Sequence, residues 1–268
     1  MHPQVNLGEE MHHVWSRLVL AAMAALLLNG AHSLHAQAQP SLPKIIDFNK
    51  HLWVNYSGEH AVRGRWGFHF DAQWRRSDLG SDWQQYLIRP ALNYRLSPNL
   101  LLTSGYTYAR TYPYGDFPAA KAFPEHRLYQ QVLYTRRTRG LTVQQRPRLE
   151  QRFVKYPVNP ADKPWTYQNR FRHMVRIEAP IGSPDNPNRW YVPVYDEIFL
   201  GIPPNFGART FDQNRLAAGI GRAHGSLKAE VVYMNQFLGQ RNGRIFEFNN
   251  TIVFSISSSA PLSGLWTR

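Results

Sequence analysis

Residues 65–76, RWGFHFDAQWRR, alternate between apolar and polar side chains over nearly their whole length. One set of alternate positions holds Trp66, Phe68, Phe70, Ala72 and Trp74, and the other includes His69, Asp71, Gln73 and Arg75. Because residues two apart share a face of a β-strand, this segment has one apolar and one polar face. The apolar face would form the core of a soluble protein, whereas in a membrane barrel it would meet lipid and the polar face would line the interior.

The same alternation recurs along the chain over segments of about ten residues that are separated by turn residues. We expect strands at 50–59, 65–76, 86–96, 100–111, 126–137, 141–153, 167–179, 190–200, 211–221, 227–237 and 245–257. These strands are long enough to cross a bilayer, which takes about 9–11 tilted residues, and they exceed the usual soluble strand of about 5–6.

The expected connections alternate between short and long. Short turns fall at 97–99, 139–140 and 224–225, and long loops at 112–124, 154–166 and 201–210. Outer-membrane barrels have this asymmetry, with short periplasmic turns and longer external loops. The sequence therefore predicts an all-β fold, a transmembrane antiparallel up-and-down β-barrel. Bacterial single-chain barrels with both ends in the periplasm need an even number of strands. The count of eleven segments therefore contains one strand too many or too few, and we expect 10–12 strands.

The N-terminal residues have the features of an export signal. Arg17 precedes the apolar run 18–28, and the small-residue pattern Ala36-Gln37-Ala38 follows. The run is shorter than the roughly 20 residues of a spanning helix, so we expect cleavage after Ala38 rather than an anchor. The domains would be a signal peptide (1–38) and an outer-membrane barrel (39–268). Either Met1 or Met11 can be the start of this signal.

Composition narrows the class of protein further. The chain has 268 residues, 31 Lys+Arg against 18 Asp+Glu, and no Cys, which excludes disulfides and thiolate sites. The positive charge favours anionic neighbours such as lipid headgroups or polyanions. The alternation already accounts for the aromatic residues, so we expect no nucleic-acid binding.

Several spaced polar and aromatic motifs resemble one known family. They are Trp53, Asp71-x-Gln73-x-Arg75, QYLIRPALNYRLSPNLLLTSGYTYAR (85–110), Glu125-x-Arg127 with Gln130-Gln131, RLEQRF (148–153), Asn169-Arg170 with Arg172, Tyr195-Asp196-Glu197, Asn214-Arg215 and Tyr233-Met234-Asn235-Gln236. The pattern spans about 48–257 and is similar to the bacterial domain-of-unknown-function 2490 family. The resemblance implies a predicted outer-membrane β-barrel without an assigned role, so it supplies no catalytic positions.

The polar faces of the expected strands are rich in arginine. We expect these side chains to line the lumen: Asp71, Arg75, Arg89, Arg146, Arg148, Glu150, Arg152, Arg170, Arg172, Arg176 and Glu178. If the lumen is open, a ring of guanidinium groups would favour the passage or binding of small anionic solutes. The alternative, which we favour, is a structural ladder of ion pairs that fills a small barrel. Asp196 and Glu197 are adjacent and point to opposite faces, and we expect such acids to pair with lumen arginines.

The apolar faces supply candidates for the aromatic girdles at the two membrane interfaces. These are Trp66, Trp74, Tyr94, Tyr106, Tyr108 and Trp190. Outer-membrane lipids and the outer-membrane insertion machinery would then be partners of the chain, and the bacterial outer membrane its location.

Two other functional classes stay open at this stage. A soluble periplasmic lipocalin-like binding protein would keep the aromatic side chains inside. An outer-membrane lipid hydrolase would need a serine within reach of a histidine. We expect His51, His60, His69, His126, His173 and His224 to be girdle or lumen residues, and we expect no enzyme activity, no catalytic residues, no metal and no cofactor.

Overall fold

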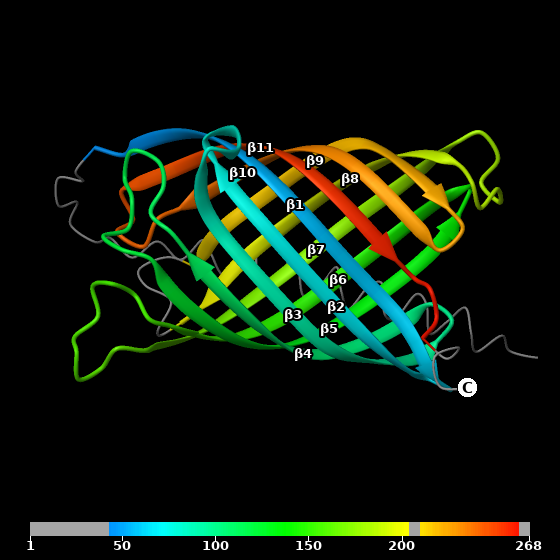
Figure 1. Cartoon of the computed structure of the whole chain (residues 1–268), viewed down its shortest axis with the longest axis horizontal. Coiled ribbons are helices and arrows are strands. Elements are labelled where there is room, and N and C mark those ends of the chain that lie inside the picture. Colours follow the sequence, from blue (N-terminus) through cyan, green and yellow to red (C-terminus); the bar gives the residue numbers. More distant parts are fainter. Residues whose placement is uncertain (1–42, 204–209, 263–268) are drawn as a thin grey trace, which may run out of the picture. The chain divides into compact units, whose positions relative to one another are not determined.

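A computed structural model of the chain describes residues 43–203 and 210–262. In these ranges the backbone forms eleven β-strands that close into a barrel (Figure 1). The strands are β1 (Ile45–Arg63), β2 (Trp66–Ser77), β3 (Asp82–Ser97), β4 (Leu100–Thr111), β5 (Phe123–Thr138), β6 (Leu141–Val154), β7 (Thr166–Ile181), β8 (Trp190–Ile202), β9 (Phe211–His224), β10 (Leu227–Gly239) and β11 (Ile245–Ser258). The expected all-β barrel of 10–12 strands is confirmed, and each expected strand lies within or largely overlaps an observed one.

The barrel closes through a parallel pair of strands. β1 pairs with β11 in parallel from Ile45↔Ile245 to Gly58↔Ser258, while every other neighbouring pair is antiparallel. The expectation that eleven segments contained an error is therefore wrong. An odd number of strands closes when the first and last strands run in the same direction, and this places Ile45 and Ser258 at opposite ends of the barrel.

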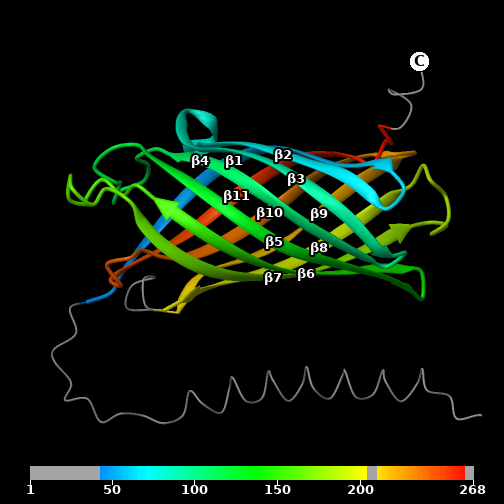
Figure 2. The same ribbon diagram turned by 90° about the horizontal axis from the view of Figure 1, so that it is seen from below.

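The connections at the two ends of the barrel differ in length. Two-residue turns at 64–65, 98–99, 139–140 and 225–226 join strands at one end, which we call the short-turn end. The loops 112–122 and 155–165 project from the other, the long-loop end, as Figures 1 and 2 show. The connection at 182–189 is an exception, because it is longer and lies at the short-turn end.

The alternation of β2 shows how its two faces are used. His69, Asp71 and Arg75 are buried inside the barrel, whereas Trp66 and Trp74 are exposed on its outside. The polar face of this strand therefore points inward and its apolar face outward. The signal peptide expected at residues 1–38 lies outside the described residues. Within them, no helix is both long and apolar enough to cross a membrane.

Besides Pro124 and Pro180, which lie one residue from the ends of β5 and β7, three prolines lie further inside strands: Pro90 in β3, Pro147 in β6 and Pro193 in β8. Each continues the pairing with one neighbouring strand, opposite Phe70, His173 and Glu178 respectively. With the other neighbour the pairing skips the proline, as it does between Ile88 and Ala91. Proline has no N–H to donate, so each proline leaves a local gap in one ladder of hydrogen bonds.

Close approach of β9 and β10 depends on a glycine. A Cβ atom added to Gly219 would lie 2.6 Å from the Cα of Val232 and would also meet the carbonyl oxygen of Val231. We expect Gly219→Ala to destabilise the barrel by about 1–3 kcal/mol, because the backbone of β10 would have to move. The measurement is the denaturant midpoint followed by circular dichroism. Ala218→Val, on the exposed face of the same strand, is the matched control, and equal midpoints for the two variants would contradict the prediction.

Candidate functional site

The structure places all eleven expected lumen residues with their side chains inside the barrel. Nine of them are buried: Asp71, Arg75, Arg89, Arg148, Glu150, Arg152, Arg170, Arg172 and Glu178. Arg146 and Arg176 are half-buried and form ion pairs with interior carboxylates. The six expected girdle residues lie on the outer face, where Trp66, Trp74, Tyr106 and Trp190 are exposed and Tyr94 and Tyr108 are half-buried.

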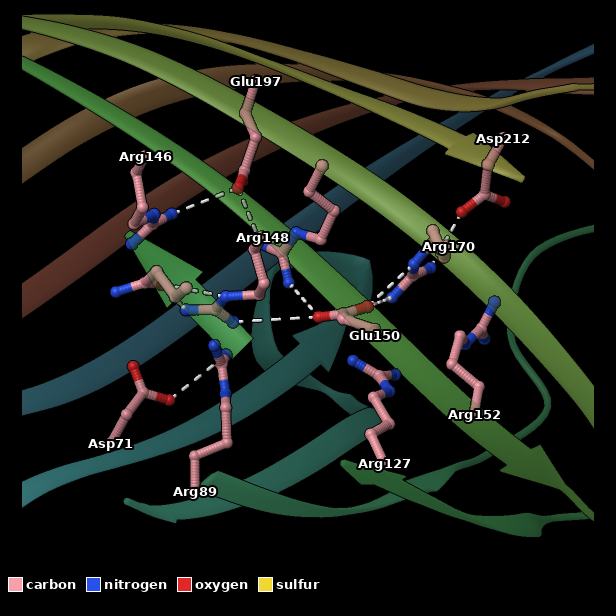
Figure 3. Close-up of polar contacts among 12 residues, drawn as sticks. Asp71, Arg89, Arg127, Arg146, Arg148, Glu150, Arg152, Arg170, Glu197 and Asp212 are labelled. Atoms are coloured by element: carbon pink, nitrogen blue, oxygen red, sulfur yellow. Dashed lines mark hydrogen bonds and ion pairs between the residues drawn. The ribbon is translucent and has the colours of Figure 1, made fainter. Parts of the chain in front are cut away.

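Glu150 of β6 is the centre of the interior ion-pair network (Figure 3). Its Oε2 accepts hydrogen bonds from Arg170 Nη2 at 2.6 Å and Nε at 2.9 Å, and its Oε1 accepts one from Arg172 Nη1 at 2.7 Å. Arg148 Nη1 lies 3.7 Å from the same Oε1, and Arg170 also donates to Asp212 at 2.8 Å. One buried carboxylate therefore holds guanidinium groups from two adjacent strands.

Glu197 of β8 forms a second shared carboxylate. Its Oε1 accepts from Arg172 Nη2 at 2.8 Å and from Arg146 Nη2 at 3.1 Å, while Arg215 Nη1 lies 3.9 Å from Oε2. Arg172 thus bridges Glu150 and Glu197, which joins the two centres into one network. Since each arginine donates in a fixed planar geometry, this bridging fixes the positions of the strands that carry it.

Glu125 of β5 forms a third centre nearer the long-loop end. Arg127 donates to its two oxygens at 2.7 and 2.8 Å, and Arg152 contacts the same two atoms from β6. The carboxylate is almost completely buried. Both of its oxygens are therefore satisfied by guanidinium groups rather than by solvent.

Aromatic rings inside the lumen stack against the same arginines. The guanidinium carbon of Arg75 lies 3.8 Å from the ring centroid of Trp53, and that of Arg172 lies 4.3 Å from Phe199. Arg148 lies 4.5 Å above Tyr129. The flat faces of guanidinium groups cannot accept or donate hydrogen bonds. The aromatic rings cover these faces and add cation–π attraction.

Several members of this network were not expected from the sequence as lumen residues. They are Glu125, Arg127, Asp212, Arg215 and Glu230, whereas Glu197 was expected to pair with lumen arginines and does so. Glu125-x-Arg127 has the two-residue spacing that places both side chains on one face, so that signal was available. Of the adjacent pair, Glu197 faces inward and pairs with arginines, whereas Asp196 faces outward and accepts from Asn214.

Positive charge exceeds negative charge in the middle of the lumen. We call the following residues the central belt: Arg75, Arg89, Arg127, Arg146, Arg148, Arg152, Arg170, Arg172, Arg215, Asp71, Glu125, Glu150, Glu197 and Asp212. It contains nine arginines and five carboxylates. Buried nitrogen atoms of five arginines make no hydrogen bond within the described part of the chain: Arg89 Nε, Arg146 Nε, Arg148 Nη1, Arg172 Nε and Arg215 Nε. The belt is therefore positively charged, and some of its buried N–H donors have no hydrogen-bond acceptor.

The central belt divides the lumen into two chambers. The larger has a volume of about 480 Å³ and reaches the short-turn end at Ser226 and Ser259. The smaller has a volume of about 170 Å³, lies toward the long-loop end, and is bounded there in part by Tyr114. Arg89, Arg172 and Arg215 line both chambers, so side chains rather than open space fill the middle of the barrel. Burial raises the pKa of the Tyr114 hydroxyl, which donates to Glu247 at 2.9 Å.

The described residues contain no group of three His, Asp or Glu side chains placed to hold a metal ion. His224 and Ser226 stand two places apart on either side of Gly225, and both are exposed, but only Ser226 lines the larger chamber. Other histidines in the described ranges contact different groups, such as Glu59 with His69 and Tyr106 with His126. None of these contacts is a serine–histidine pair.

Removal of the Glu150 charge tests whether the network holds the barrel together. We expect Glu150→Gln to destabilise the fold by about 3–5 kcal/mol, because buried guanidinium groups lose their shared counter-charge. The measurement is the denaturant midpoint of the folded barrel.

Asp196→Asn is the matched control for this change. It makes the same chemical change on the outer face, where the carboxylate accepts from Asn214 and not from a buried arginine, and it should not destabilise the fold. A Glu150→Gln midpoint equal to that of this control would show that the network is dispensable.

Comparison with protein families gives a match to this chain. Residues 50–247 match the family described as "Protein of unknown function (DUF2490)". No curated protein matches the chain. The match covers more than half of the chain and includes most of the residues of the ion-pair network.

Proposed function

The chain belongs to the DUF2490 family, and we propose that it is an outer-membrane β-barrel whose lumen binds small anionic solutes. The family carries no assigned activity, so the proposal depends on the distribution of side chains over the barrel. We propose binding rather than passage through an open pore, because the central belt fills the middle of the lumen.

The observation that carries the proposal is the inverted distribution of polarity. On the outside, Phe48 is 71% exposed and Leu92 is 61% exposed, and large exposed apolar side chains occur on every strand. Inside, Glu150 and Arg148 are only 1% and 3% exposed. Soluble monomers rarely expose apolar surface on this scale. A lipid environment would cover this surface, and it favours a closed barrel because closure leaves no unpaired strand edge.

Aromatic contacts near both ends of the barrel agree with a position across a bilayer. At the short-turn end the rings of Trp66 and Tyr94 have centroids 4.9 Å apart. At the long-loop end Trp83 lies 6.1 Å from Trp74 and 5.5 Å from Tyr112. Membrane barrels concentrate aromatic residues at both interfaces, where the amphipathic rings meet the headgroups.

The two rival classes have less support. A soluble lipocalin-like binder would place its aromatic residues inside, whereas the expected girdle residues here face outward. A lipid hydrolase needs a nucleophile, a base and an orienting group held together. The described residues do not provide such a set.

Cell fractionation tests the membrane location. We expect the protein, expressed in a bacterium with its N-terminal residues, to sediment with the outer membrane and to need detergent for release. On gels it should migrate faster before heating than after, because the closed barrel resists unfolding in detergent. Recovery of a soluble periplasmic protein without detergent would overturn the proposal.

A charge on the outer face tests lipid contact directly. Ile88 is exposed at the middle of β3, next to the inward-facing Arg89. We expect Ile88→Arg to cost about 2–4 kcal/mol of folding stability in lipid vesicles, the cost of an arginine near the bilayer midplane. Folding is measured by the heat-modifiable band at graded urea concentrations, with Ile88→Leu as control. Equal folding of the two variants would argue that this face does not meet lipid.

A further inference from the structure

The larger chamber has two chemically different walls. In the order of strands around the barrel, β6 and β7 lie opposite β1 and β11. The side of β1, β10 and β11 presents Trp53, Val232, Met234 and Val253, which pack together with Ala217 of β9. The rest of the chamber is lined mainly by polar and charged groups, among which Leu133 and Met174 are also apolar.

The opposite wall is cationic. Arg146 and Arg148 of β6 and Arg172 and Arg176 of β7 line the chamber there, and Arg89 of β3 adjoins them. In all, seven cationic side chains and five carboxylates line the chamber. The cations are Arg89, Arg146, Arg148, Arg172, Arg176, Arg215 and Lys228, and the carboxylates are Glu59, Asp71, Glu178, Glu197 and Glu230.

The carboxylates of the chamber already have partners. Glu178 accepts from Lys228 at 2.7 Å and from Arg176, and Glu230 accepts from Tyr191 at 2.7 Å. Glu59 is bound by His69, Asp71 by Arg89, and Glu197 by Arg172. Glu150, outside the chamber, lies beside Arg148 and Arg172, so the excess positive charge of the chamber is only partly matched.

Unsatisfied donors mark where an anion would bind. Arg148 is buried, and its Nη1 lies 3.7 Å from Glu150 and makes no hydrogen bond. Arg89 is also buried, and its Nε makes no hydrogen bond. A buried donor left without a partner costs roughly 1–3 kcal/mol, more when it is charged, so a bound anion that accepts from it is strongly favoured.

We propose that this chamber binds a monoanion with an apolar tail, a medium-chain carboxylate. The carboxylate lies against Arg148 and Arg89, and the chain lies along Val232, Met234 and Val253. The inference rests on the proposed anion-binding lumen and specifies its ligand class. A volume of about 480 Å³ lies within the usual range of small-molecule sites, roughly 300–1,000 Å³. A small inorganic anion would leave the apolar wall without a function in binding, and a neutral lipid would leave the guanidinium groups unsatisfied.

Equilibrium dialysis of radiolabelled carboxylates tests the proposal. The protein is reconstituted in nanodiscs of neutral lipid, and empty nanodiscs give the background partitioning. We expect octanoate to bind, with hexanoate and butanoate progressively weaker, by roughly tenfold for each two methylene groups removed. Octanamide, which has the same tail without the charge, should bind at least about tenfold more weakly than octanoate.

Two substitutions separate the contributions of the walls. Arg148→Gln should weaken octanoate binding by at least about tenfold, which corresponds to the loss of a charge-assisted hydrogen bond. Met234→Gln should reduce the dependence on chain length while butanoate binding changes little. Arg95→Gln, an exposed residue near the end of β3, is the matched control and should behave as the unchanged protein does. Heat-modifiable migration shows whether each variant is folded.

Two further results would overturn the proposal. The first is that phosphate or sulfate binds and that carboxylates bind with an affinity that does not depend on chain length. This result would reject the apolar-tailed ligand but would still support an anion-binding lumen. Equal affinity for octanoate and octanamide would reject the role of the arginines. Failure of the proposed membrane location would appear separately, as a soluble protein in the fractionation experiment.

Discussion

The shared carboxylate of Glu150 is the interaction on which the interior of the barrel depends. Burying a guanidinium group is costly unless a counter-charge and hydrogen bonds replace the water that it loses. Glu150 supplies that counter-charge to Arg170 and Arg172, and Arg172 then extends the network to Glu197. The strands β6, β7 and β8 are thereby joined through their side chains as well as through their backbone ladders.

This arrangement also explains why the central belt stays positive. Glu125, Glu150 and Glu197 each serve two or three arginines, so the central belt is held with fewer acids than bases. Aromatic rings stabilise part of the remaining positive charge through cation–π contacts. Phe199 lies beside three guanidinium groups, those of Arg170, Arg172 and Arg215. Aromatic rings carry no net charge, however, and they leave the excess positive charge available to an anion from outside. Stability and ligand preference thus arise from the same side chains.

Much of the fold follows from local sequence, because the two-residue period of strands such as 65–76 decides which side chain faces which way. The period placed Arg148 and Glu150 on a polar face and Trp66 and Trp74 on an apolar face without knowledge of which strands pair, and strand length and loop asymmetry indicated which face points inward. The closure of the barrel could not be obtained in this way, since pairing of Ile45 with Ile245 joins residues 200 positions apart. The particular acids that pair with each arginine could not be predicted for the same reason. Arg146 reaches Glu197 across a separation of 51 residues that only the register of three strands defines.

The parallel seam between β1 and β11 limits how such a barrel can be rearranged. Ile45 and Ser258 lie at opposite mouths, so a peptide that joined them would have to run the length of the barrel, about 3.3 Å per extended residue. A circularly permuted chain with a short linker is therefore excluded, although many folds with adjacent ends accept one. Gain or loss of a β-hairpin changes the strand number by two. Barrels of nine or thirteen strands derived from this one would therefore also close through a parallel pair of first and last strands. Only the addition or loss of a single strand could remove it.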